Sequence, residues 1–366
     1  MLFESEFRRP VDSGALLDTI RRLSAQLPPV RIMEVCGTHT MAIAKSGLRQ
    51  ILPENIELVS GPGCPVCVTP ASFIDEVLKL SSLPEVTLTT YGDLMRVPGS
   101  VRGDDLRRRK ALGADIRVVY SPMDALSIAM AEPDRQVVFL GVGFETTTPG
   151  TALTVLEAQK HGLRNFSLFS MLKRTTPALQ TLVKQDDLGI NGFLCPGHVA
   201  TILGADAFRF LAEEHGLPCV VAGFENGDLL AAIAMLLQQI KINTPKLENE
   251  YTRAVSLEGN CAAAAVMDKV FTPCTSLWRG LGSIPDSGLC LREEYGFFDA
   301  VKRFGICPSK QDVPSPCRCG DVICGRISPT QCSLFGRACT PDDPVGPCMV
   351  SSEGACAAAY HYGRLL

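Results

Sequence analysis

The sequence lacks the features that mark several large classes of protein. Its 366 residues carry a formal net charge of −4, so there is no basic excess of the kind that nucleic-acid-binding proteins direct at phosphates. It has no apolar run near the roughly 18 residues that a membrane span needs. Its first residues include acids where a secretory signal would carry bases. These absences predict a soluble, cytoplasmic protein that binds neither nucleic acid nor membrane.

Cysteine is plentiful, yet it is too dilute for a disulfide-stapled secreted scaffold, because 16 cysteines are spread over the whole chain. In a reducing compartment, clustered cysteines are typical of metal ligands or redox thiols. Only three of them precede residue 190, and eight fall in the last sixty residues. The sequence therefore predicts two kinds of thiol chemistry in two parts of the chain.

Short β-branched segments alternate with amphipathic helical segments between about residues 30 and 223. This alternation is typical of βαβ units, in which helices cover both faces of a parallel sheet. A helical stretch at 251–270 is expected next, followed by a tail rich in Pro, Gly and Cys. The expected strands are 30–35, 56–60, 86–90, 116–120, 136–141, 166–169, 192–194 and 219–222.

These patterns predict an α/β fold with two Rossmann-like parallel-sheet lobes facing a cleft, and a third domain that is helical and loop-rich. We expect the first lobe at 29–125 with about 226–245, and the second at 126–225. Residues 1–28 and 246–366 are expected to form the third domain, with the N-terminal helix against the tail. Because such a tail cannot build an ordinary apolar core, we expect a bound cluster or metal to order it.

The unusual motifs follow predicted strands, and open parallel sheets bind ligands outside the carboxyl ends of their strands. Cys36 follows the first strand and precedes a helix that Thr38 is expected to cap, with His39 three residues further on. A helix start favours the thiolate, which binds metals and attacks electrophiles. The alternative is a buried structural cysteine beside a hydrogen-bonded histidine.

Cys64 and Cys67 form a C-x-x-C sequence between a predicted strand and a predicted helix. This placement is typical of a thiol–disulfide redox pair. A zinc site would need two more ligands, and the chain has no second C-x-x-C. We therefore predict a redox pair, with half a zinc site or an inert pair as the alternatives.

Three further polar residues stand at strand ends. Glu145 and Glu225 each end a Gly-Phe-Glu motif, either as cleft carboxylates or as helix caps. The stretch around Glu145 lacks the Lys of a P-loop and the third Gly of a dinucleotide fingerprint, so it is a weak phosphate-loop candidate. His198 is a candidate acid–base group or ligand, with helix capping as the alternative.

The tail holds four cysteines separated by seven, nine and eight residues, among glycines and prolines. Four thiolates with loop-rich spacers suit a [4Fe–4S] cluster, and zinc is the alternative. Three more tail cysteines, Cys317, Cys319 and Cys324, have a spacing that assigns them no role. The four predicted ligands are Cys332, Cys339, Cys348 and Cys356.

Together these motifs resemble the HypD family of [NiFe]-hydrogenase maturation proteins. The resemblance covers the chain from about residue 30 to its end. It implies a scaffold and redox protein on which iron receives cyanide and CO before transfer to the hydrogenase large subunit. The matching segments are CGTHT, GPGCPVC, GFETTTPGTA, CPGHV, GFE and CSLFGRACTPDDPVGPCMVSSEGAC.

The resemblance also implies partners and residue roles. The transient Fe(CN)₂CO iron would be held between this chain and a HypC-type chaperone, and a HypE-type protein would donate cyanide. Cys36 would bind the iron beside His39, with His198 and Glu353 as supporting polar residues. Cys64 and Cys67 would be the redox dithiol, and the four tail cysteines would hold a [4Fe–4S] cluster that exchanges electrons with it.

Two other functions remain open at this point. One is an iron–sulfur-dependent thiol–disulfide oxidoreductase acting on a partner protein, which needs the C-x-x-C and the cluster but not Cys36. The other is a zinc-stabilised binding module without catalytic chemistry.

Overall fold

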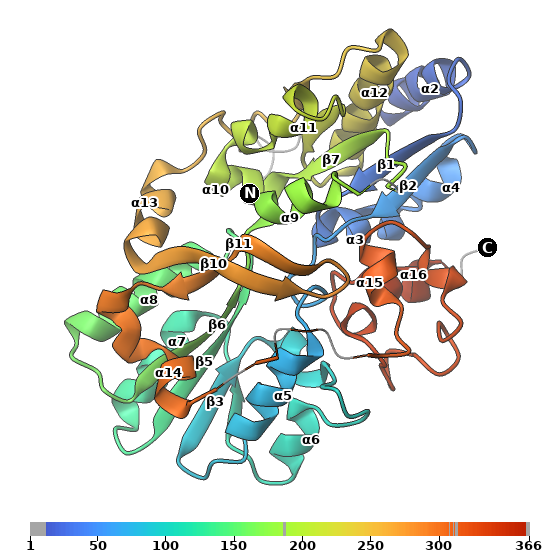
Figure 1. Cartoon of the computed structure of the whole chain (residues 1–366). Helices are drawn as coiled ribbons and strands as arrows, with labels where there is room; N and C mark the ends of the chain where they lie inside the picture. The colour runs from blue at the N-terminus through green and yellow to red at the C-terminus, as the bar shows by residue number, and fades with distance from the viewer. Residues whose placement is uncertain (1–11, 186–187, 307, 310, 312–313, 364–366) are drawn as a thin grey trace.

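Two parallel β-sheets form the framework of the chain, which we describe from a computed structural model (Figure 1). The structure describes residues 12–185, 188–306, 308–309, 311 and 314–363. Sheet A has the strand order β2–β1–β7–β8–β9, and sheet B has the order β4–β3–β5–β6. The strands of sheet A are β1 (Val30–Glu34), β2 (Ile56–Ser60), β7 (Gly192–Pro196), β8 (Cys219–Ala222) and β9 (Leu247–Asn249). Those of sheet B are β3 (Val86–Thr90), β4 (Ile116–Val118), β5 (Gln136–Gly143) and β6 (Phe166–Leu172).

The predicted α/β class with parallel sheets is confirmed. Each expected strand is present, with ends shifted by no more than three residues. Every position of β3 and of β7 is buried, as is typical of central strands that helices cover on both faces. The continuous apolar and β-branched runs therefore identified the strands correctly.

The predicted boundary between the two lobes differs from the strand pairing. β1 pairs with β2 and then with β7, not with β3. Sheet A therefore takes its strands from 30–60 and 192–249, and sheet B takes its strands from 86–172. Parallel strands are joined by long crossovers, so the chain can leave one sheet, build the other and return. The alternation of strands and helices does not reveal that return.

Helices cover both faces of sheet A. On one face, α2 (Ser13–Ser24) packs on α12 (Asn226–Ile242), and α3 (Gly37–Ser46) and α4 (Leu48–Ile51) complete the layer. The N-terminal helix thus belongs to this lobe and not to the tail, because its buried Ile20 and Leu23 face α12 and β1. The other face is covered by α10 (Gly197–Leu203), η2 (Ala205–Phe208) and α11 (Phe210–Glu213).

Sheet B is covered in the same way. One face carries α5 (Ala71–Leu80), η1 (Gly92–Arg96) and α6 (Leu106–Ala111). The other carries α7 (Pro122–Ala131) and α8 (Thr148–Lys160). The helix α9 (Thr175–Leu182) packs into the apolar cluster that also holds Phe193 of sheet A, so it joins the two lobes.

Residues 246–304 serve the two lobes instead of the tail domain predicted for them. β9 extends sheet A, and α13 (Cys261–Val270), shorter than the helix expected at 251–270, packs on α8. β10 (Phe271–Trp278) and β11 (Gly282–Leu291) form an antiparallel hairpin beside β6, followed by η3 (Glu293–Phe298) and α14 (Ala300–Phe304). A disulfide joins Cys274 to Cys290 across the hairpin, with 6.0 Å between their Cα atoms.

Buried Lys173 fixes the hairpin to the end of β6. Its Nζ donates to Ser276 Oγ at 2.9 Å and to the Leu277 carbonyl at 2.8 Å, and it lies over the Trp278 ring. Burial lowers the pKa of Lys173 to about 7. The end of β10 is thereby attached to sheet B.

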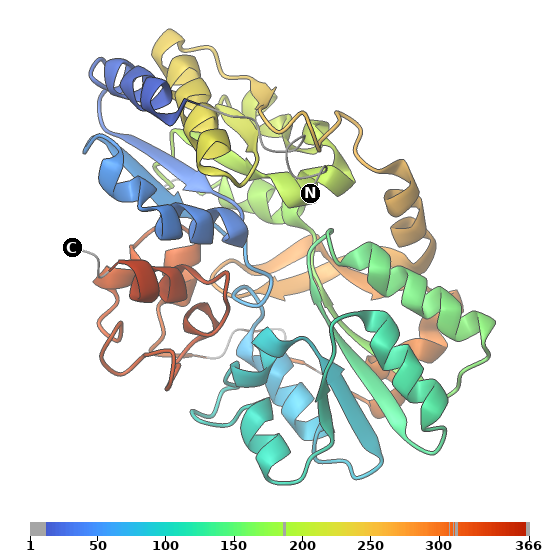
Figure 2. The same cartoon turned by 180° about the vertical axis from the view of Figure 1, so that it is seen from behind.

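The tail lies beside α3 and β2 of sheet A in both views (Figures 1 and 2). It contains α15 (Cys319–Ile323), η4 (Pro329–Gln331), η5 (Pro347–Met349) and α16 (Ala355–Tyr362), and α16 packs on α3. Val322, Ile323 and Met349 join the apolar cluster shared with sheet B. The tail is thus ordered in part by ordinary apolar burial, contrary to expectation. Across the described residues, every helix is too short or too polar to cross a membrane.

Candidate functional site

The two lobes and the tail enclose a cavity of about 310 Å³ at the carboxyl ends of the strands. This is the cleft that the sequence predicts at strand ends, and loops from both sheets reach it. We call it the central cleft. Its lining includes Cys36 after β1, Val66 after β2, Tyr91 and Asp93 after β3, Phe144 and Thr146 after β5, His198 after β7, and Ser351 and Glu353 from the tail.

Cys36 stands at the start of α3 and faces the central cleft. It is itself the N-cap residue, so the expected cap at Thr38 is wrong. The backbone N–H groups of Thr38 and His39 point at the Cys36 thiol and favour its charged form, but burial outweighs them. Burial, with a contribution from the Glu353 carboxylate, raises the pKa of Cys36 to about 11. The free thiol is therefore neutral near pH 7, and a cation bound next to it would stabilise the thiolate.

The His39 ring turns away from the central cleft. It is completely buried, and its Nε2 lies 3.2 Å from the Ala222 carbonyl and 3.0 Å from the Gly223 carbonyl. Two carbonyl oxygens can only accept, so Nε2 carries the proton and Nδ1 is left without a partner among the described residues. Burial lowers the pKa of His39 to about 4. Its ring thus ties α3 to the end of β8.

A hydrogen bond from Thr38 docks the tail beside Cys36. Thr38 Oγ1 donates to Glu353 Oε1 at 2.8 Å. Gly37 makes this approach possible, because a Cβ at that position would lie 2.4 Å from the Glu353 Cβ. Burial raises the pKa of Glu353, and nearby Asp93 adds to the effect. Glu353 is therefore placed in the cleft, as the resemblance implies.

Asp93 is a cleft residue to which the sequence assigns no role. It accepts hydrogen bonds from Ser351 Oγ at 3.1 Å, from the Ser352 N–H at 3.2 Å and from Ser352 Oγ at 3.1 Å. It thus ties the end of β3 to the tail, as Thr38 ties the end of β1. The only signal in the sequence is its position in Tyr91-Gly-Asp directly after a strand.

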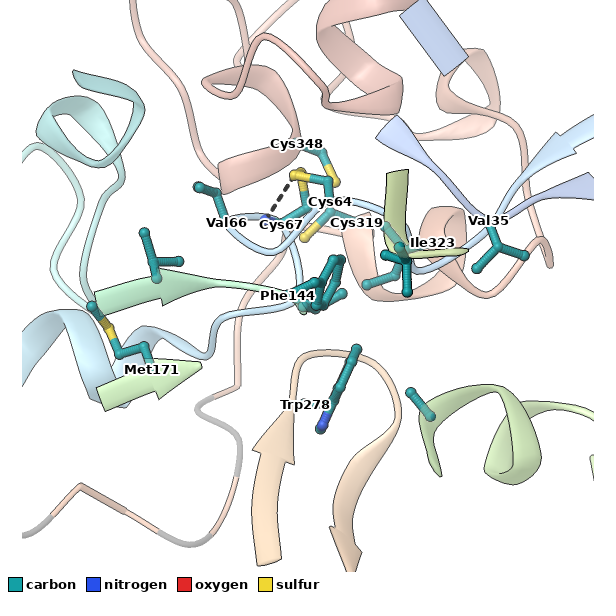
Figure 3. Packing of buried hydrophobic residues seen from close by; sticks show 14 of the residues in the cluster. Val35, Cys64, Val66, Cys67, Phe144, Met171, Trp278, Cys319, Ile323 and Cys348 are labelled. Atoms are coloured by element: carbon teal, nitrogen blue, oxygen red, sulfur yellow. Dashed lines mark hydrogen bonds between the residues drawn. A yellow bond between two sulfur atoms is a disulfide. The ribbon is translucent and has the colours of Figure 1, made fainter. Parts of the chain in front are cut away.

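Cys64 and Cys67 form a disulfide in the loop between β2 and α5, with 5.2 Å between their Cα atoms. Both are buried, at 4% and 0% exposure, and the Cys67 N–H donates to Cys64 Sγ. The same loop packs on the backbone of Cys36, because a Cβ at Gly63 would lie 2.3 Å from the Cys36 nitrogen, and the Gly37 N–H donates to the Gly63 carbonyl at 3.0 Å. Figure 3 shows the pair in the buried cluster that also contains Phe144 and Trp278.

His198 opens onto the central cleft at the start of α10. The residue is exposed at one side, and its ring stacks on Phe224, with 3.9 Å between ring centroids. Partial burial lowers its pKa, so the ring is neutral near pH 7 and can accept or donate a proton. The structure therefore places His198 where an acid–base or ligand role is possible.

The other two candidate carboxylates do not line the central cleft. Glu145 is buried, and its two oxygens accept from the Thr175 N–H at 2.8 Å and from Thr175 Oγ1 at 2.7 Å, at the start of α9. Glu225 caps the start of α12 in a reciprocal pair with Asp228. In both cases the helix-cap alternative describes the geometry, although Glu145 binds the start of α9 and not of α8, the helix that follows it in the chain.

The four predicted cluster ligands line one small cavity in the tail. Cys317 and Cys319, which had no predicted role, line it too, because α15 folds back onto η5. Contacts between thiols run from Cys317 to Cys319 and from Cys319 to Cys348. We call this set the tail thiols: Cys317, Cys319, Cys332, Cys339, Cys348 and Cys356.

Fold and site together define an α/β protein with a free thiol in a cleft, a disulfide behind it and a thiol-lined cavity next to it. Residues 13–363 match the family model HypD, described as the "Hydrogenase formation hypA family". Hydrogenase maturation factors HypD of Rhizobium leguminosarum bv. viciae and of Escherichia coli K12 are both 47% identical to this chain. These alignments cover 100% and 99% of the chain, and 96% and 98% of the relatives. The chain belongs to the HypD family of hydrogenase maturation factors.

The burial of His39 predicts a specific loss of stability in acid. The unfolded chain binds a proton at His39 near pH 6.5, whereas the folded chain resists it down to about pH 4. Stability is therefore lost as the pH falls below about 6.5, by about 2 kcal/mol at pH 5. Anaerobic urea unfolding at pH 7, 6 and 5 should show this loss in the wild-type chain but not in His39→Gln, which keeps a donor for the carbonyls. Parallel pH profiles of the two proteins would contradict the account.

Proposed function

We propose that this protein is the scaffold on which iron bound at Cys36 receives cyanide and CO before transfer to a [NiFe]-hydrogenase large subunit. One observation carries the proposal: Cys36 is the single free thiol among the described residues that line the central cleft. The resemblance and the family both support it. A HypC-type chaperone supplying a second thiolate and a HypE-type cyanide donor are the partners that the proposal requires.

The environment of Cys36 suits a metal substrate. A thiolate is a soft ligand, which matches low-valent iron that carries cyanide and CO. Because burial keeps the free thiol protonated, iron would bind by displacing that proton, and the positive charge of the iron would stabilise the thiolate. Val35, Val66 and Val142 line the same cavity and would exclude the water that could remove cyanide or oxidise the iron.

Polar groups in the central cleft can orient the bound ligands. Thr146 and His198 line the cavity, and either can donate a hydrogen bond to a cyanide nitrogen. Glu353 is held by Thr38 and stands next to Cys36. His39 acts behind them, because its ring fixes the helix that carries Cys36.

The buried disulfide suits the electron demand of cyanide transfer. A thiocyanate R–S–CN releases cyanide as CN⁻ and leaves R–S⁻ only when the S–C bond takes up two electrons. Two thiolates at Cys64 and Cys67 supply two electrons when they close to a disulfide. Their loop touches Cys36 and lines the central cleft through Pro65 and Val66.

We infer that Cys332, Cys339, Cys348 and Cys356 hold a [4Fe–4S] cluster. Thiolates are the ligands of such clusters, and these four line one cavity beside Leu334 and Phe335, so the donor set fits. Within the described ranges, no three His, Cys or acidic side chains lie close enough together to hold a single metal ion. A four-iron cluster spreads its thiolates more widely than a single ion does. Once bound, it would supply one-electron transfer to the dithiol.

The oxidoreductase alternative is less consistent with the geometry. A disulfide on a partner protein has to reach the sulfur atoms, yet Cys64 and Cys67 are 4% and 0% exposed. That function also leaves Cys36 without a role. The burial of the dithiol therefore favours an internal electron acceptor, such as a reaction in the central cleft.

Replacing Cys36 should abolish iron assembly in the central cleft. We expect Cys36→Ala, purified anaerobically with its chaperone, to lose the cyanide and CO stretching bands in the infrared spectrum. Cys195→Ala is the matched control, because Cys195 is a buried cysteine at a strand end that does not line the cleft. It should keep the bands. Full-strength bands in Cys36→Ala would place the iron elsewhere and end the proposal.

The Cys64–Cys67 disulfide should be reversible. After the protein is poised in dithiothreitol redox buffers, alkylation and mass spectrometry should show both thiols free at low potential and both protected at high potential. The hairpin pair Cys274–Cys290 serves as an internal reference in the same digest. A pair that stays fixed in one state at all potentials, in folded protein, would exclude the electron relay.

Loss of one tail ligand should remove the cluster. We expect Cys348→Ala to lose the brown absorbance and most of the iron, because cluster binding contributes to the folding of the tail. Cys261→Ala, at an exposed cysteine on α13, should keep both. Full iron content in Cys348→Ala would assign the ligands to other tail thiols, for which Cys317 and Cys319 are the nearest candidates.

A further inference from the structure

Arg279 occupies the tip of the β10–β11 hairpin, between the dithiol loop and the tail thiols. It is only 7% exposed, although it carries a full charge. No ion pair joins it to a carboxylate within the part of the chain that the structure describes. A buried guanidinium needs other partners to offset the cost of leaving water, so its contacts identify its role.

On one side, Arg279 binds the two residues that follow Cys67. Its backbone N–H donates to the Val68 carbonyl at 2.9 Å, and its Nε donates to the Thr69 carbonyl at 3.2 Å. Both carbonyls belong to the turn that closes the C-x-x-C loop. The hairpin tip therefore fixes the chain immediately beyond the disulfide.

On the other side, the same guanidinium reaches the tail thiols. Its charge favours the thiolate form of both Cys319 and Cys317, and its side chain lines a cavity together with Pro314, Ser315 and Pro316, which precede them. The adjacent Gly280 packs directly on Gly320, where a Cβ on Gly280 would lie 2.5 Å from the Gly320 Cα. Cys324 Sγ also donates to the Gly280 carbonyl at 3.6 Å. The hairpin tip and α15 are thus in backbone contact.

These contacts place one side chain between two thiol centres. Cys319 touches Cys348, one of the four proposed cluster ligands. Figure 3 draws Cys64, Cys67, Cys319 and Cys348 in one region of the buried cluster, with Trp278 of the hairpin below them. Lys173 anchors the hairpin itself to sheet B.

We propose that Arg279 is the positioning residue that couples the tail thiols to the Cys64–Cys67 pair, by holding the dithiol loop and α15 in contact through the hairpin tip. This inference rests on the proposed electron relay. In that relay, two electrons break the Cys64–Cys67 S–S bond, and two protons from water complete the two thiols. The electrons come from an external one-electron donor by way of the tail cluster. Arg279 reacts with nothing; it sets the geometry across which the electrons pass.

The test compares two routes of reduction in the anaerobically purified full chain. Reduced methyl viologen, a one-electron donor, reduces the proposed cluster in the tail, whereas dithiothreitol attacks the disulfide directly. The rate of each route is read by quenching, alkylating and counting free Cys64 and Cys67. We expect Arg279→Gln to slow the viologen route by about tenfold or more and to leave the dithiothreitol route within about twofold, because small misplacements cost large factors in rate. Arg279→Lys, which keeps the charge but not the planar fork, should fall between wild type and Arg279→Gln.

Hydrogen exchange provides a readout that does not depend on the cluster. Amides of the dithiol loop and of α15 should exchange faster in Arg279→Gln. Arg292→Gln is the matched control, because Arg292 follows β11 at the other end of the hairpin, is exposed, donates to the Asp268 carbonyl and does not line the cavity of the tail thiols. It should change neither exchange nor the two reduction rates.

Three results would count against these ideas, and they are distinguishable. An unchanged viologen rate in both Arg279 variants would overturn the coupling role. Equal slowing of both routes would show that Arg279 only stabilises the fold, and it would also overturn the coupling role. If the wild-type chain itself shows no viologen-driven reduction of Cys64–Cys67, the proposed relay fails, and the inference fails with it.

Discussion

The docking of the tail onto the start of α3 is the constraint on which the rest of the site depends. Two polar anchors hold it, one from Thr38 to Glu353 and one from Asp93 to Ser351 and Ser352. They join the ends of strands in two different sheets to a single short segment of the tail. Without them the central cleft would lose one wall. The absence of a side chain at Gly37 is what lets the tail approach so closely.

Burial then sets the chemistry of each group. It keeps the Cys36 thiol and the His39 ring neutral, so neither carries charge into the site before a substrate arrives. It encloses the disulfide at Cys64 and Cys67, which keeps the sulfur atoms out of reach of another protein. It leaves Arg279 as a buried charge that binds the Thr69 carbonyl and favours the thiolate form of Cys319. The proposed reductive transfer of cyanide from a thiocyanate to iron would benefit from this burial, because it would exclude water and stray oxidants.

The sequence predicts the strands and the cleft well, because both follow from local patterns. Runs such as 86–90 are apolar or β-branched at every position, and motifs such as CGTHT stand directly after them. Strand pairing could not be predicted, because β1 pairs with β7, which follows it by more than 150 residues in the chain. The composition of segment 246–304 predicts that it belongs to the tail, yet the segment contributes a strand, a helix and the hairpin.

The candidate site shows the same limit at the level of single residues. Glu145 and Glu225 had the right position in the chain, but their carboxylates face helix starts and not the cleft. Asp93 and Arg279 gain their importance from partners more than 200 residues away in the chain. Cys319 gains its importance from Arg279 and Cys348, which lie in separate segments. No local pattern marks such contacts.

The most direct measurement is anomalous X-ray diffraction at the iron absorption edge from crystals of the anaerobic complex with its chaperone. The account predicts two separate iron positions: one at bonding distance from Cys36 Sγ in the central cleft, and a cluster among Cys332, Cys339, Cys348 and Cys356. Iron found only in the tail, with none at Cys36 in a complex that shows the cyanide and CO bands, would contradict it.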